Sequence, residues 1–504
     1  MARKKEKTPS YVVELPLVAS ATDERRLLDR FRVGTRLTNV MIQHAHAVVG
    51  ALRADPAWVA ARKLPKDARP AAYAALRKTH GFSSVAFDAV VCAQAKAAGF
   101  YGRIGTHEMQ MVAKQVFKAA EEWVCGTRGR LRFKSFRRPV RSLSGKNNTG
   151  MLQWKADTRL LQVERDWSLA VSLPDLKKDE WLCAALDAPT KYCRILWRTV
   201  RGERRWFVQL VQEGLTPLKA ALLAKLAAPG SRGGLDLGPS TVGWCTPTAA
   251  GLVRLCAEIE RPERLIRRLQ RTIDRQRRAA NPDNFNADGT VKRGCRTWVT
   301  SNRQRAVAAE LADGQRQEAA IRGDSHGRLI NDLLSHALDW RDDGVSPKAL
   351  QKRYGKSVGK RAPGLLMSEL TRKAERAGGS RTVIDVRNLK TSQYDHTTDD
   401  FVKKPLSQRR HVFRDGRGSV QRDVYSAFLH LHADGSTHNP VGLETAWREM
   451  TSLLSVAGLC DLTCKEALLA KASREPLQPR QSALPVISST PWSEPHAVRA
   501  VPQG

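Results

Sequence analysis

One acidic residue inside an apolar, strand-like segment constrains this chain more than any other feature. Residues 234–244 read GLDLGPSTVGW, which predicts a strand, a tight turn at Gly238 and Pro239, and a second strand. Asp236 lies between two leucines, so its carboxylate is expected on the strand face opposite to theirs. Aspartate is uncommon in strands because its side chain competes for backbone hydrogen bonds. Two interpretations are open at this point: a turn-capping aspartate or a site carboxylate.

The charge of the chain indicates a polyanionic partner. Its 504 residues include 85 Lys and Arg against 50 Asp and Glu, a formal net charge of +35. Such a charge attracts nucleic acids, because counterions are released when cationic side chains neutralise phosphates. Ribosomal proteins, membrane-surface proteins and nucleic-acid enzymes share this property. With 41% hydrophobic residues the chain is globular, and its length allows two to four domains.

The sequence predicts a cytoplasmic protein without a membrane partner. No apolar run approaches the ~18 residues that span a bilayer. The basic N-terminus is followed by polar residues instead of an apolar signal core. The nine cysteines are scattered, as expected for free thiols in a reducing compartment.

Hydrophobic periodicity predicts the order of the elements. A strand at residues 10–18 precedes helices near 22–41, 56–78, 84–98 and 106–124. Strands are expected at 150–171 and 191–213, the second region forming a hairpin around 200–203, and the first strand is compatible with the same sheet. Helices are expected near 216–227, 300–320, 325–338 and 364–377 and from 421, with a strand at 383–386. The Pro-rich tail from about 475 is expected to be disordered.

Four basic segments are predicted to bind nucleic acid. In residues 127–138, cations alternate with Leu131 and Phe133, which predicts a strand with one cationic face; the alternative is an edge strand kept soluble by charge. Residues 261–278 predict an arginine-rich amphipathic helix whose only acids are Glu263 and Asp274; the alternative is an ordinary solvated face. The residues expected to contact nucleic acid are Arg128, Arg130, Arg132, Lys134, Arg137, Arg138, Arg267, Arg268, Arg271, Arg275, Arg278, Arg353, Lys356, Lys360, Arg361, Lys403, Lys404 and Arg409.

Three acids stand in settings that suit a metal site. Asp236 lies within a strand, Asp343 follows Trp340, and Asp423 begins a helix. Carboxylates that converge repel one another unless divalent cations neutralise them, and two Mg²⁺ ions about 4 Å apart would activate water for phosphodiester hydrolysis. Long stretches of chain separate the three acids, so spacing alone does not show that they converge.

Six segments carry a resemblance to a known family. They are residues 234–242 (GLDLGPSTV), 348–358 (KALQKRYGKSV), 361–364 (RAPG), 372–379 (RKAERAGG), 403–409 (KKPLSQR) and 421–429 (QRDVYSAFL). They resemble the transposon-encoded TnpB proteins and the compact type V CRISPR effectors. The resemblance implies an α/β RNase H-like (RuvC) nuclease domain plus a β-barrel wedge domain with an inserted helical recognition domain. It also implies guide RNA and target DNA as partners.

The resemblance divides the chain into five parts. The wedge β-barrel would comprise residues 1–20 and 127–215, and the helical recognition domain residues 21–126. The RuvC nuclease domain would comprise residues 228–390 and 420–435. A target-strand binding loop, corresponding to a degenerate zinc ribbon, would occupy residues 391–419, and C-terminal helices with a disordered tail residues 436–504.

Carried over residue by residue, the resemblance assigns three catalytic and metal-binding acids. Asp236 matches the first RuvC carboxylate and Asp423 the third. The second acid is usually a Glu shortly before the KALQK segment, and counting back places Asp343 there, with Asp342 as the neighbouring alternative. Asp is one methylene shorter than Glu, which would loosen a metal site and lower activity.

Zinc is not expected in the loop at residues 391–419. The four cysteines common in the family correspond here to Asp395, Thr398, Phe413 and Asp415. Zinc requires a tetrahedral set of suitable donors, and these positions supply no thiolate. The remaining alternative is an unusual zinc site in which His396 and His411 act as ligands together with Asp395 and Asp415.

The resulting prediction is an RNA-guided endonuclease that cuts DNA by Mg²⁺-dependent hydrolysis. The guide would read the target sequence, while the protein would read a short flanking motif. Two alternatives remain: an RNA-guided DNA-binding protein that acts by occupancy, and a transposase. The sequence leaves open the origin of the guide, the flanking motif and the oligomeric state.

Overall fold

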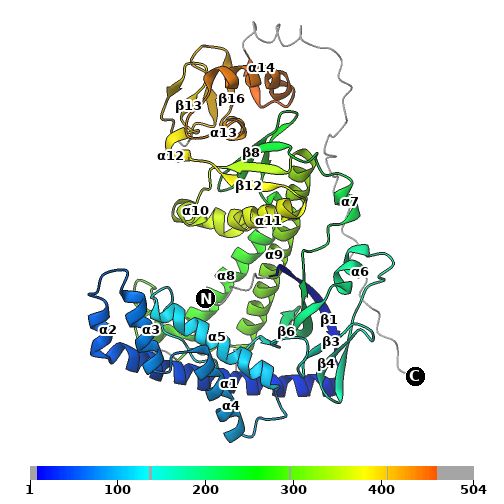
Figure 1. Ribbon diagram of the computed structural model, residues 1–504, viewed down its shortest axis with the longest axis vertical. Helices are drawn as coiled ribbons and strands as arrows, with labels where there is room; N and C mark the ends of the chain where they lie inside the picture. Colours follow the sequence, from blue (N-terminus) through cyan, green and yellow to red (C-terminus); the bar gives the residue numbers. More distant parts are fainter. Residues whose placement is uncertain (1–7, 136–138, 295–296, 406, 463–504) are drawn as a thin grey trace.

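The computed structural model describes residues 8–135, 139–294, 297–405 and 407–462. The expected disordered tail and two of the predicted nucleic-acid contacts, Arg137 and Arg138, lie outside these ranges. Figure 1 shows the N-terminal helices and one sheet at one end of the molecule, and a second sheet with the C-terminal elements at the other. No helix within the described ranges is both long and apolar enough to cross a bilayer.

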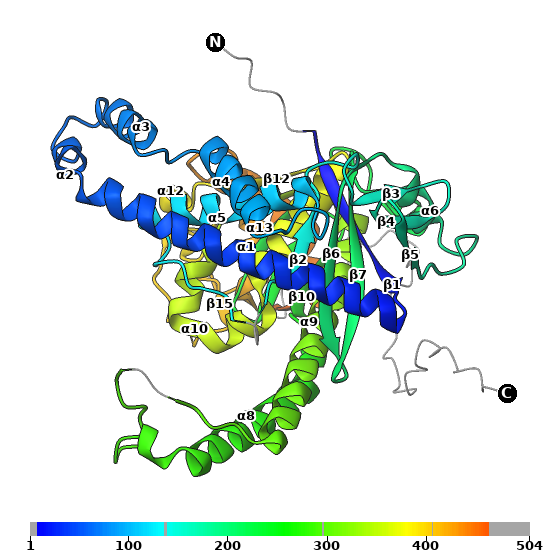
Figure 2. The ribbon, with the colours of Figure 1, turned by 90° about the horizontal axis from the view of Figure 1, so that it is seen from below.

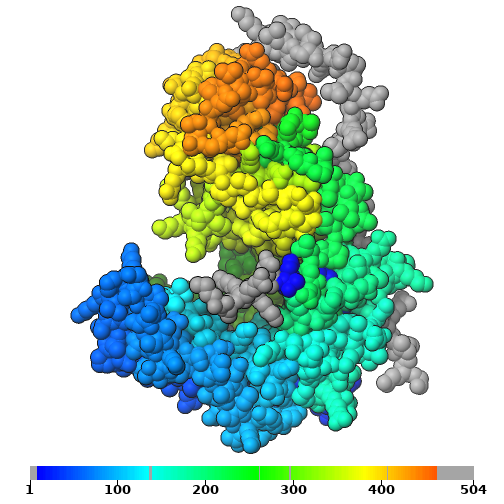
Figure 3. Space-filling model, viewed as in Figure 1, coloured from blue at the N-terminus to red at the C-terminus, as the bar shows by residue number. Residues whose placement is uncertain are grey.

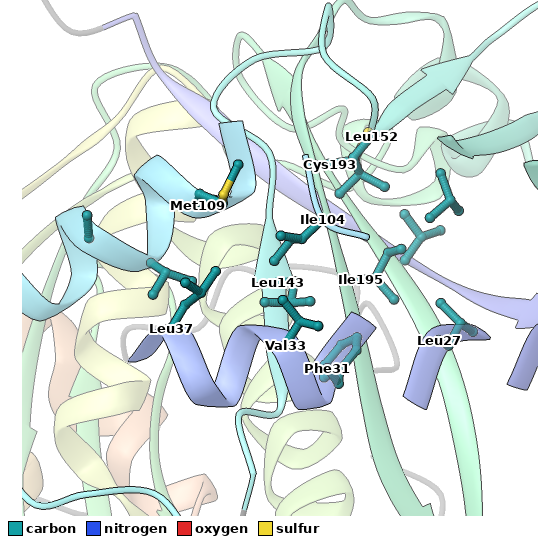
Figure 4. Packing of buried hydrophobic residues seen from close by; sticks show 14 of the residues in the cluster. Leu27, Phe31, Val33, Leu37, Ile104, Met109, Leu143, Leu152, Cys193 and Ile195 are labelled. Atoms are coloured by element: carbon teal, nitrogen blue, oxygen red, sulfur yellow. The ribbon is translucent and has the colours of Figure 1, made fainter. Parts of the chain in front are cut away.

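Five helices form the N-terminal helical block. They are α1 (Ala21–Ala54), α2 (Pro56–Ala61), α3 (Arg69–Thr79), α4 (Ser84–Ala97) and α5 (Thr106–Val124). Helix α1 begins at Ser20, which forms a capping box with Asp23. The helix expected at 56–78 is instead two helices, α2 and α3. Figure 4 shows how the block packs on the first sheet, with Phe31 and Val33 of α1 near Leu143 and Ile195.

The first sheet has seven strands in the order β2-β6-β7-β1-β5-β4-β3. Its strands are β1 (Ser10–Val18), β2 (Ser142–Ser144), β3 (Gln153–Lys155), β4 (Leu160–Glu164), β5 (Trp167–Val171), β6 (Thr190–Val200) and β7 (Glu203–Glu213), and α6 (Glu180–Asp187) lies between β5 and β6. Strand β1 pairs with β7 along residues 10–16 and with β5 at Leu17 and Val18. This pairing confirms that the first strand and the 191–213 hairpin share one sheet, with the helical block inserted in the chain between them.

The expected closed barrel is not found in the described part of the chain. The edge strands β2 and β3 pair with β6 and β4 and not with each other. Each has only three residues, and α5 contacts β2 at its edge of the sheet. Closure requires the two edge strands to run side by side, which strands this short do not achieve here. The sheet is therefore open and bends at β1.

The second sheet has five strands in the order β10-β9-β8-β11-β12. They are β8 (Arg232–Leu237), β9 (Thr241–Cys245), β10 (Ala250–Arg254), β11 (Asp339–Asp342) and β12 (Ser380–Val383). Strands β8, β9 and β10 form an antiparallel meander, while β11 is parallel to β8 and β12 is parallel to β11. The predicted strand, turn and strand at 234–244 are confirmed, and β8 is central. The helix expected at 216–227 is only α7 (Ala220–Leu223).

Helices cover both faces of the second sheet. Helix α13 (Arg422–Leu431) contacts β8, β9 and β11 on one face. On the other, α9 (Asn302–His336) and α11 (Pro363–Arg376) pack apolar side chains around Trp340. The two helices expected at 300–320 and 325–338 are one, α9, because Gly323 and Gly327 adopt helical backbone angles. Helix α9 packs along α8 (Glu260–Ala280), and Figure 2 shows this pair as an arm projecting from the body.

The remaining elements follow β11 in the chain. They are α10 (Pro347–Arg361), α12 (Val386–Leu389), β13 (Tyr394–Asp395), β14 (Asp400–Phe401), β15 (Arg410–Val412), β16 (Gly418–Gln421), α14 (Pro440–Val456) and β17 (Cys460–Leu462). Buried Phe413, Tyr425, Phe428 and Trp447 form an aromatic core between the 391–419 loop, α13 and α14. In Figure 3 this region is the yellow and orange end of the molecule.

The described part of the basic segment at 127–138 does not form the expected strand. Residues 127 and 128 are in a bend, residues 129–134 have no strand assignment, and Phe133 is 56% exposed although alternation placed it on an apolar face. The Asn39 side chain accepts from the Lys134 amide and donates to its carbonyl, and His46 bonds the Leu131 carbonyl. Side chains of α1 thus satisfy the backbone groups that a neighbouring strand would otherwise pair.

Two glycines allow α13 to lie directly on the backbone of the second sheet. A Cβ at Gly234 would lie 1.9 Å from the carbonyl oxygen of Ala427. A Cβ at Gly243 would lie 2.5 Å from the carbonyl group of Asp423. Both clashes are with helix backbone, so no side-chain rotation relieves them. The first turn of α13, including Asp423, is therefore held against β8 and β9.

Gly234→Ala and Gly243→Ala are expected to destabilise the protein, by about 3 kcal/mol or more, because α13 must move away from the sheet. Gly323→Ala on α9 is the matched control: a Cβ there meets nothing within 4 Å, so helix propensity should stabilise the protein by about 0.5–1 kcal/mol. The apparent urea-unfolding midpoints of the three variants, compared with that of wild type, measure these changes in stability. Equal midpoints for Gly234→Ala and Gly323→Ala would contradict the close packing.

Candidate active site

Strand register brings Asp236 and Asp343 side by side. Asp342, the last residue of β11, is opposite Leu235 of β8 in parallel register. The next residue of each strand is Asp343 and Asp236, so continuation of the register places them next to each other. Arg341, two residues before Asp343, donates to the Ala433 carbonyl beyond the end of α13 at 2.5 Å. Alternation along the strand therefore directs Asp343 to the α13 face of the sheet as well.

Helix packing brings Asp423 to the same place from the other side. Asp236 is paired across the β8–β9 ladder with Gly243, the residue on which the backbone of Asp423 rests. Thr241 of β9 donates to Oδ2 of Asp423 at 3.3 Å. Arg422 contacts Oδ1 of Asp423 through Nη2 at 3.3 Å and through Nε at 3.4 Å. Asp423 lies in the first turn of α13, where the helix dipole favours a negative charge.

The electrostatics of Asp236 reflect this convergence. Burial is the main cause that raises the pKa of Asp236 well above its ordinary value, and the negative charges of Asp343 and Asp423 raise it further. Arg422 and a hydrogen bond from Ser426 act in the opposite direction. A raised pKa is the expected result of burying one carboxyl beside two others.

Asp343 is also held in an unfavourable environment for a charge. Burial raises its pKa to about 6, partly opposed by the hydrogen bond that Oδ1 accepts from the Val345 amide at 3.2 Å. The neighbouring Asp342 contributes to the increase. Asp236 and Asp343 therefore both gain from a cation placed between them.

The neighbouring acid, Asp342, has a different role. It is 1% exposed and faces away from α13, on the same side as Trp340. Its two carboxylate oxygens pair with Arg381 of β12 at 2.5 and 2.7 Å, and Oδ1 also accepts from the Gly344 amide at 2.8 Å. These bonds satisfy the Asp342 carboxylate within the fold, so the geometry favours Asp343 over Asp342 as the second site acid.

The three acids provide the right kind of donor for Mg²⁺, but their side chains are not drawn together around one point. Carboxylate oxygens are the ligands that this hard cation prefers. Within the described residues, no three His, Cys, Asp or Glu side chains stand close enough together to hold a metal ion. The carboxylate of Asp423 is instead turned toward Arg422 and Thr241. The backbone thus places the three acids at one site, while the Asp423 carboxylate is hydrogen-bonded to Arg422 and Thr241.

The loop at residues 391–419 is held by a buried polar and aromatic network. Asp395 accepts from Thr397 and from the Arg414 amide, and its Oδ2 lies 3.3 Å from Nε2 of His411. His396 bonds the Tyr425 hydroxyl at 2.8 Å. The other positions that correspond to the family's cysteines are dispersed: Phe413 packs on Trp447 at 5.0 Å, Asp415 pairs with Arg417, and Thr398 is exposed.

The predicted nucleic-acid contacts differ in exposure. Those on α8 are exposed, and two of them also pair with acids of the same helix, Arg267 with Glu263 and Arg278 with Asp274. On α10, Arg353 and Lys356 are exposed, whereas Lys360 and Arg361 tie the helix to its surroundings. The exposed contacts are Arg128, Arg130, Arg132, Lys134, Arg267, Arg268, Arg271, Arg275, Arg278, Arg353, Lys356, Lys403 and Arg409, and the part-buried Lys404 contacts His411.

Several residues of the site were not predicted from the sequence. Arg422, Thr241 and Ser426 reach the carboxylates through packing between α13 and β9, and no spacing rule links them. Arg422 had one available signal, since a cation directly before Asp423 is adjacent to it in the chain.

Comparison with known proteins gives limited likenesses. The chain matches no protein-family profile, and no curated protein matches it in sequence. A cryo-EM structure of the Cas12f1–sgRNA–target DNA complex superposes with a TM-score of 0.43 and 10% identity, covering 84% of this chain and 98% of that chain. A cryo-EM structure of a CRISPR–Cas12f ternary complex gives a TM-score of 0.28 and 9% identity, with 83% of each chain covered. At TM-scores below 0.5, neither likeness supports a functional inference.

The raised pKa values predict how pH affects stability without divalent ions. A carboxyl whose folded-state pKa is raised contributes stability below its unfolded value, near 4, and this contribution is lost as pH rises through the folded value. For Asp343 the loss falls between about pH 4 and pH 6, and for Asp236 it extends to higher pH. Asp343→Asn should therefore gain stability relative to wild type over that window, by about 1–3 kcal/mol.

Thermal unfolding in EDTA at several pH values measures this effect. Asp332→Asn, an exposed acid on α9, is the control and should show no such pH-dependent gain. A constant difference between wild type and Asp343→Asn from pH 4 to pH 8 would contradict the proposed environment.

Proposed function

We propose that this chain is an RNA-guided DNA endonuclease of the RuvC type, in which Asp236, Asp343 and Asp423 hold Mg²⁺. The observation that carries the proposal is the placement of these three acids, from distant parts of the chain, on one face of the second sheet under α13. The charges of Asp343 and Asp423 add to the increase that burial causes in the pKa of Asp236, as expected from that placement.

The topology of the second sheet supports the RNase H-like part of the proposal. Counted from β8, the strand order is 3-2-1-4-5, and only the second strand, β9, runs opposite to the others. The first acid lies on the central strand, the second follows the adjacent parallel strand, and the third begins the helix that covers both. This is the arrangement that the resemblance to the RuvC family implies.

Each part of the site would contribute to phosphodiester hydrolysis. Bound Mg²⁺ would activate a water molecule and stabilise the leaving oxygen. Asp236 and Asp343 would supply carboxylate oxygens from the sheet, and Asp423 would supply them from the helix. The close contact of α13 with Gly234 and Gly243 fixes the distance between these two sources. The protein's contribution is thus to hold three repelling groups together until the ions bind.

The basic surfaces support RNA and DNA as partners. The net charge of +35 favours a polyanion, and the exposed arginines of α8 lie on the arm that projects from the body in Figure 2. Arg353 and Lys356 of α10 add exposed cations. The α10 helix is anchored near the end of β8, since Ser357 donates to the Pro239 carbonyl at 2.8 Å. A strand bound along α10 would therefore pass close to Asp236.

A second function, RNA-guided binding of DNA without efficient cleavage, is favoured by one observation. Asp343 stands where the family usually has Glu. A side chain one methylene shorter displaces its oxygens by about an ångström, which can lower the rate by about 100-fold. Such a protein would act by occupying its target.

Substitution of the site acids tests the endonuclease proposal. The protein purified with its co-expressed RNA should cut matching DNA in Mg²⁺, and Asp236→Asn and Asp423→Asn should each reduce cleavage at least about 100-fold while RNA-dependent DNA binding persists. Asp332→Asn, a comparable charge change on α9, should cut as well as wild type. Undiminished cleavage by Asp236→Asn would refute the assignment.

Asp343→Glu separates the two functions. If the natural protein acts by occupancy, wild type should bind its target tightly and leave it intact, and Asp343→Glu should generate cleavage products because the longer side chain restores the ligand position. If the natural protein is a competent nuclease, Asp343→Glu should change the rate by less than about tenfold, since a site built around Asp gains little from a longer side chain. Gel analysis of DNA binding and cleavage with the same preparations distinguishes these results.

A further inference from the structure

Arg422 joins the carboxylate site to the neighbouring loop. Its guanidinium contacts Oδ1 of Asp423 at 3.3 Å, and its Nη1 donates to the carbonyl of Gln408 at 2.9 Å. Its backbone amide donates to the carbonyl of Arg409 at 3.0 Å. The Arg422 side chain is only 16% exposed, so these contacts are largely shielded from water. One side chain thus bridges a candidate metal ligand and the turn at residues 407–409.

The guanidinium of Arg422 contacts a carboxylate oxygen of Asp423 that a divalent ion would need as a ligand. Arg422 opposes the increase in the pKa of Asp236, so its positive charge acts on Asp236 as well as on Asp423, which it contacts directly. A metal ion and a guanidinium both use the oxygens of Asp423, and each is repelled by the other's charge. Ion binding at Asp423 is therefore opposed as long as Arg422 keeps its present position.

The turn that Arg422 holds belongs to a cationic surface. Arg409 of this turn is exposed, and so is Lys403, which precedes the turn in the chain. Part-buried Lys404 has its pKa lowered to about 8, mainly by burial, and Arg422 is one of the charges that act on it. Lys404 also contacts His411, which pairs with Asp395 inside the loop. Because Arg422 bonds the carbonyls of Gln408 and Arg409, a phosphate bound at Arg409 would lie beside the turn that the guanidinium contacts.

Building on the proposed metal site, we propose that Arg422 is a positioning residue that couples nucleic-acid binding at the loop to ion binding at the carboxylates. Without nucleic acid, its guanidinium holds Asp423 and disfavours the ion. A phosphate bound at Lys403 and Arg409 takes over the guanidinium, which releases the Asp423 carboxylate. Because the coupling is an equilibrium property, the ion must strengthen nucleic-acid binding by the same factor. The site then assembles only when a strand is present.

Manganese binding to the full-length protein, followed by electron paramagnetic resonance with and without a short single-stranded DNA, tests this coupling. Wild type should bind Mn²⁺ more tightly when the DNA is present. Arg422→Gln should bind Mn²⁺ about three- to tenfold more tightly than wild type without DNA, and the further increase caused by DNA should disappear. Arg422→Lys keeps the charge but loses the forked guanidinium that reaches both Asp423 and the Gln408 carbonyl. Its Mn²⁺ affinity without DNA should therefore lie between those of wild type and Arg422→Gln.

A matched control and a second readout separate this role from a general loss of charge or of folding. Arg448→Gln removes the same charge from an arginine of α14 that is 77% exposed, and it should leave both Mn²⁺ affinities unchanged. Amide hydrogen exchange of the ion-free protein should accelerate at residues 407–412 in Arg422→Gln and stay unchanged in β8 and β9. Faster exchange throughout the second sheet would instead assign Arg422 a purely structural role.

The possible results distinguish the coupling from the nuclease proposal. If Asp236→Asn binds Mn²⁺ as well as wild type does, the three acids are not the ion site, and the nuclease proposal and the coupling both fail. If Asp236→Asn abolishes binding but Arg422→Gln matches wild type with and without DNA, the metal site stands and the coupling is wrong.

Discussion

The contact between the α13 backbone and the β8 and β9 backbones is the constraint on which the candidate site depends. Gly234 and Gly243 leave no side chain between helix and sheet, and any Cβ at either position would overlap the helix backbone. The helix therefore carries Asp423 to the strand that holds Asp236, while parallel pairing of β11 with β8 aligns Asp343 beside them. The apolar core around Trp340 on the opposite face keeps this sheet in register. Three acids are thus placed by backbone geometry, and their side chains contribute little to holding them there.

Such a placement concentrates negative charge that the fold only partly compensates. The pKa increases at Asp236 and Asp343 show that the folded chain disfavours the ionised carboxylates, whereas Asp342, one residue away, is neutralised by Arg381. At the end of β11, the Asp342–Arg381 ion pair thus lies on one face of the sheet and the candidate ion ligand Asp343 on the other. The wider chain has the reverse imbalance, with an excess of cations exposed on α8 and α10. An acidic centre in a chain with such an excess of exposed cations is compatible with the proposed hydrolysis of a polyanionic substrate with divalent ions.

The sequence predicted the parts of this arrangement that depend on local patterns. The strand–turn–strand at 234–244, the hairpin around 200–203 and the helix from 421 are confirmed, because apolar periodicity and turn residues are local signals. The wrong predictions involve contacts between distant segments. Residues 127–134 have no strand assignment, because Asn39 and His46 of α1 bond the backbone groups of Lys134 and Leu131, and the first sheet remains open because its edge strands are short. Convergence of Asp236, Asp343 and Asp423 was suggested by family resemblance and not by spacing, and the role of Arg422 depends on packing that no periodicity encodes.

The most direct test of the central claim is the position of bound metal. Anomalous X-ray diffraction from crystals of the full-length protein grown with Mn²⁺ and a nucleic acid substrate locates the ions without reference to activity. The three acids, if they form one site, predict anomalous density among the carboxylates of Asp236, Asp343 and Asp423, on the α13 face of the second sheet. Well-ordered carboxylates with no anomalous density between them, or Mn²⁺ bound only elsewhere, would contradict the account.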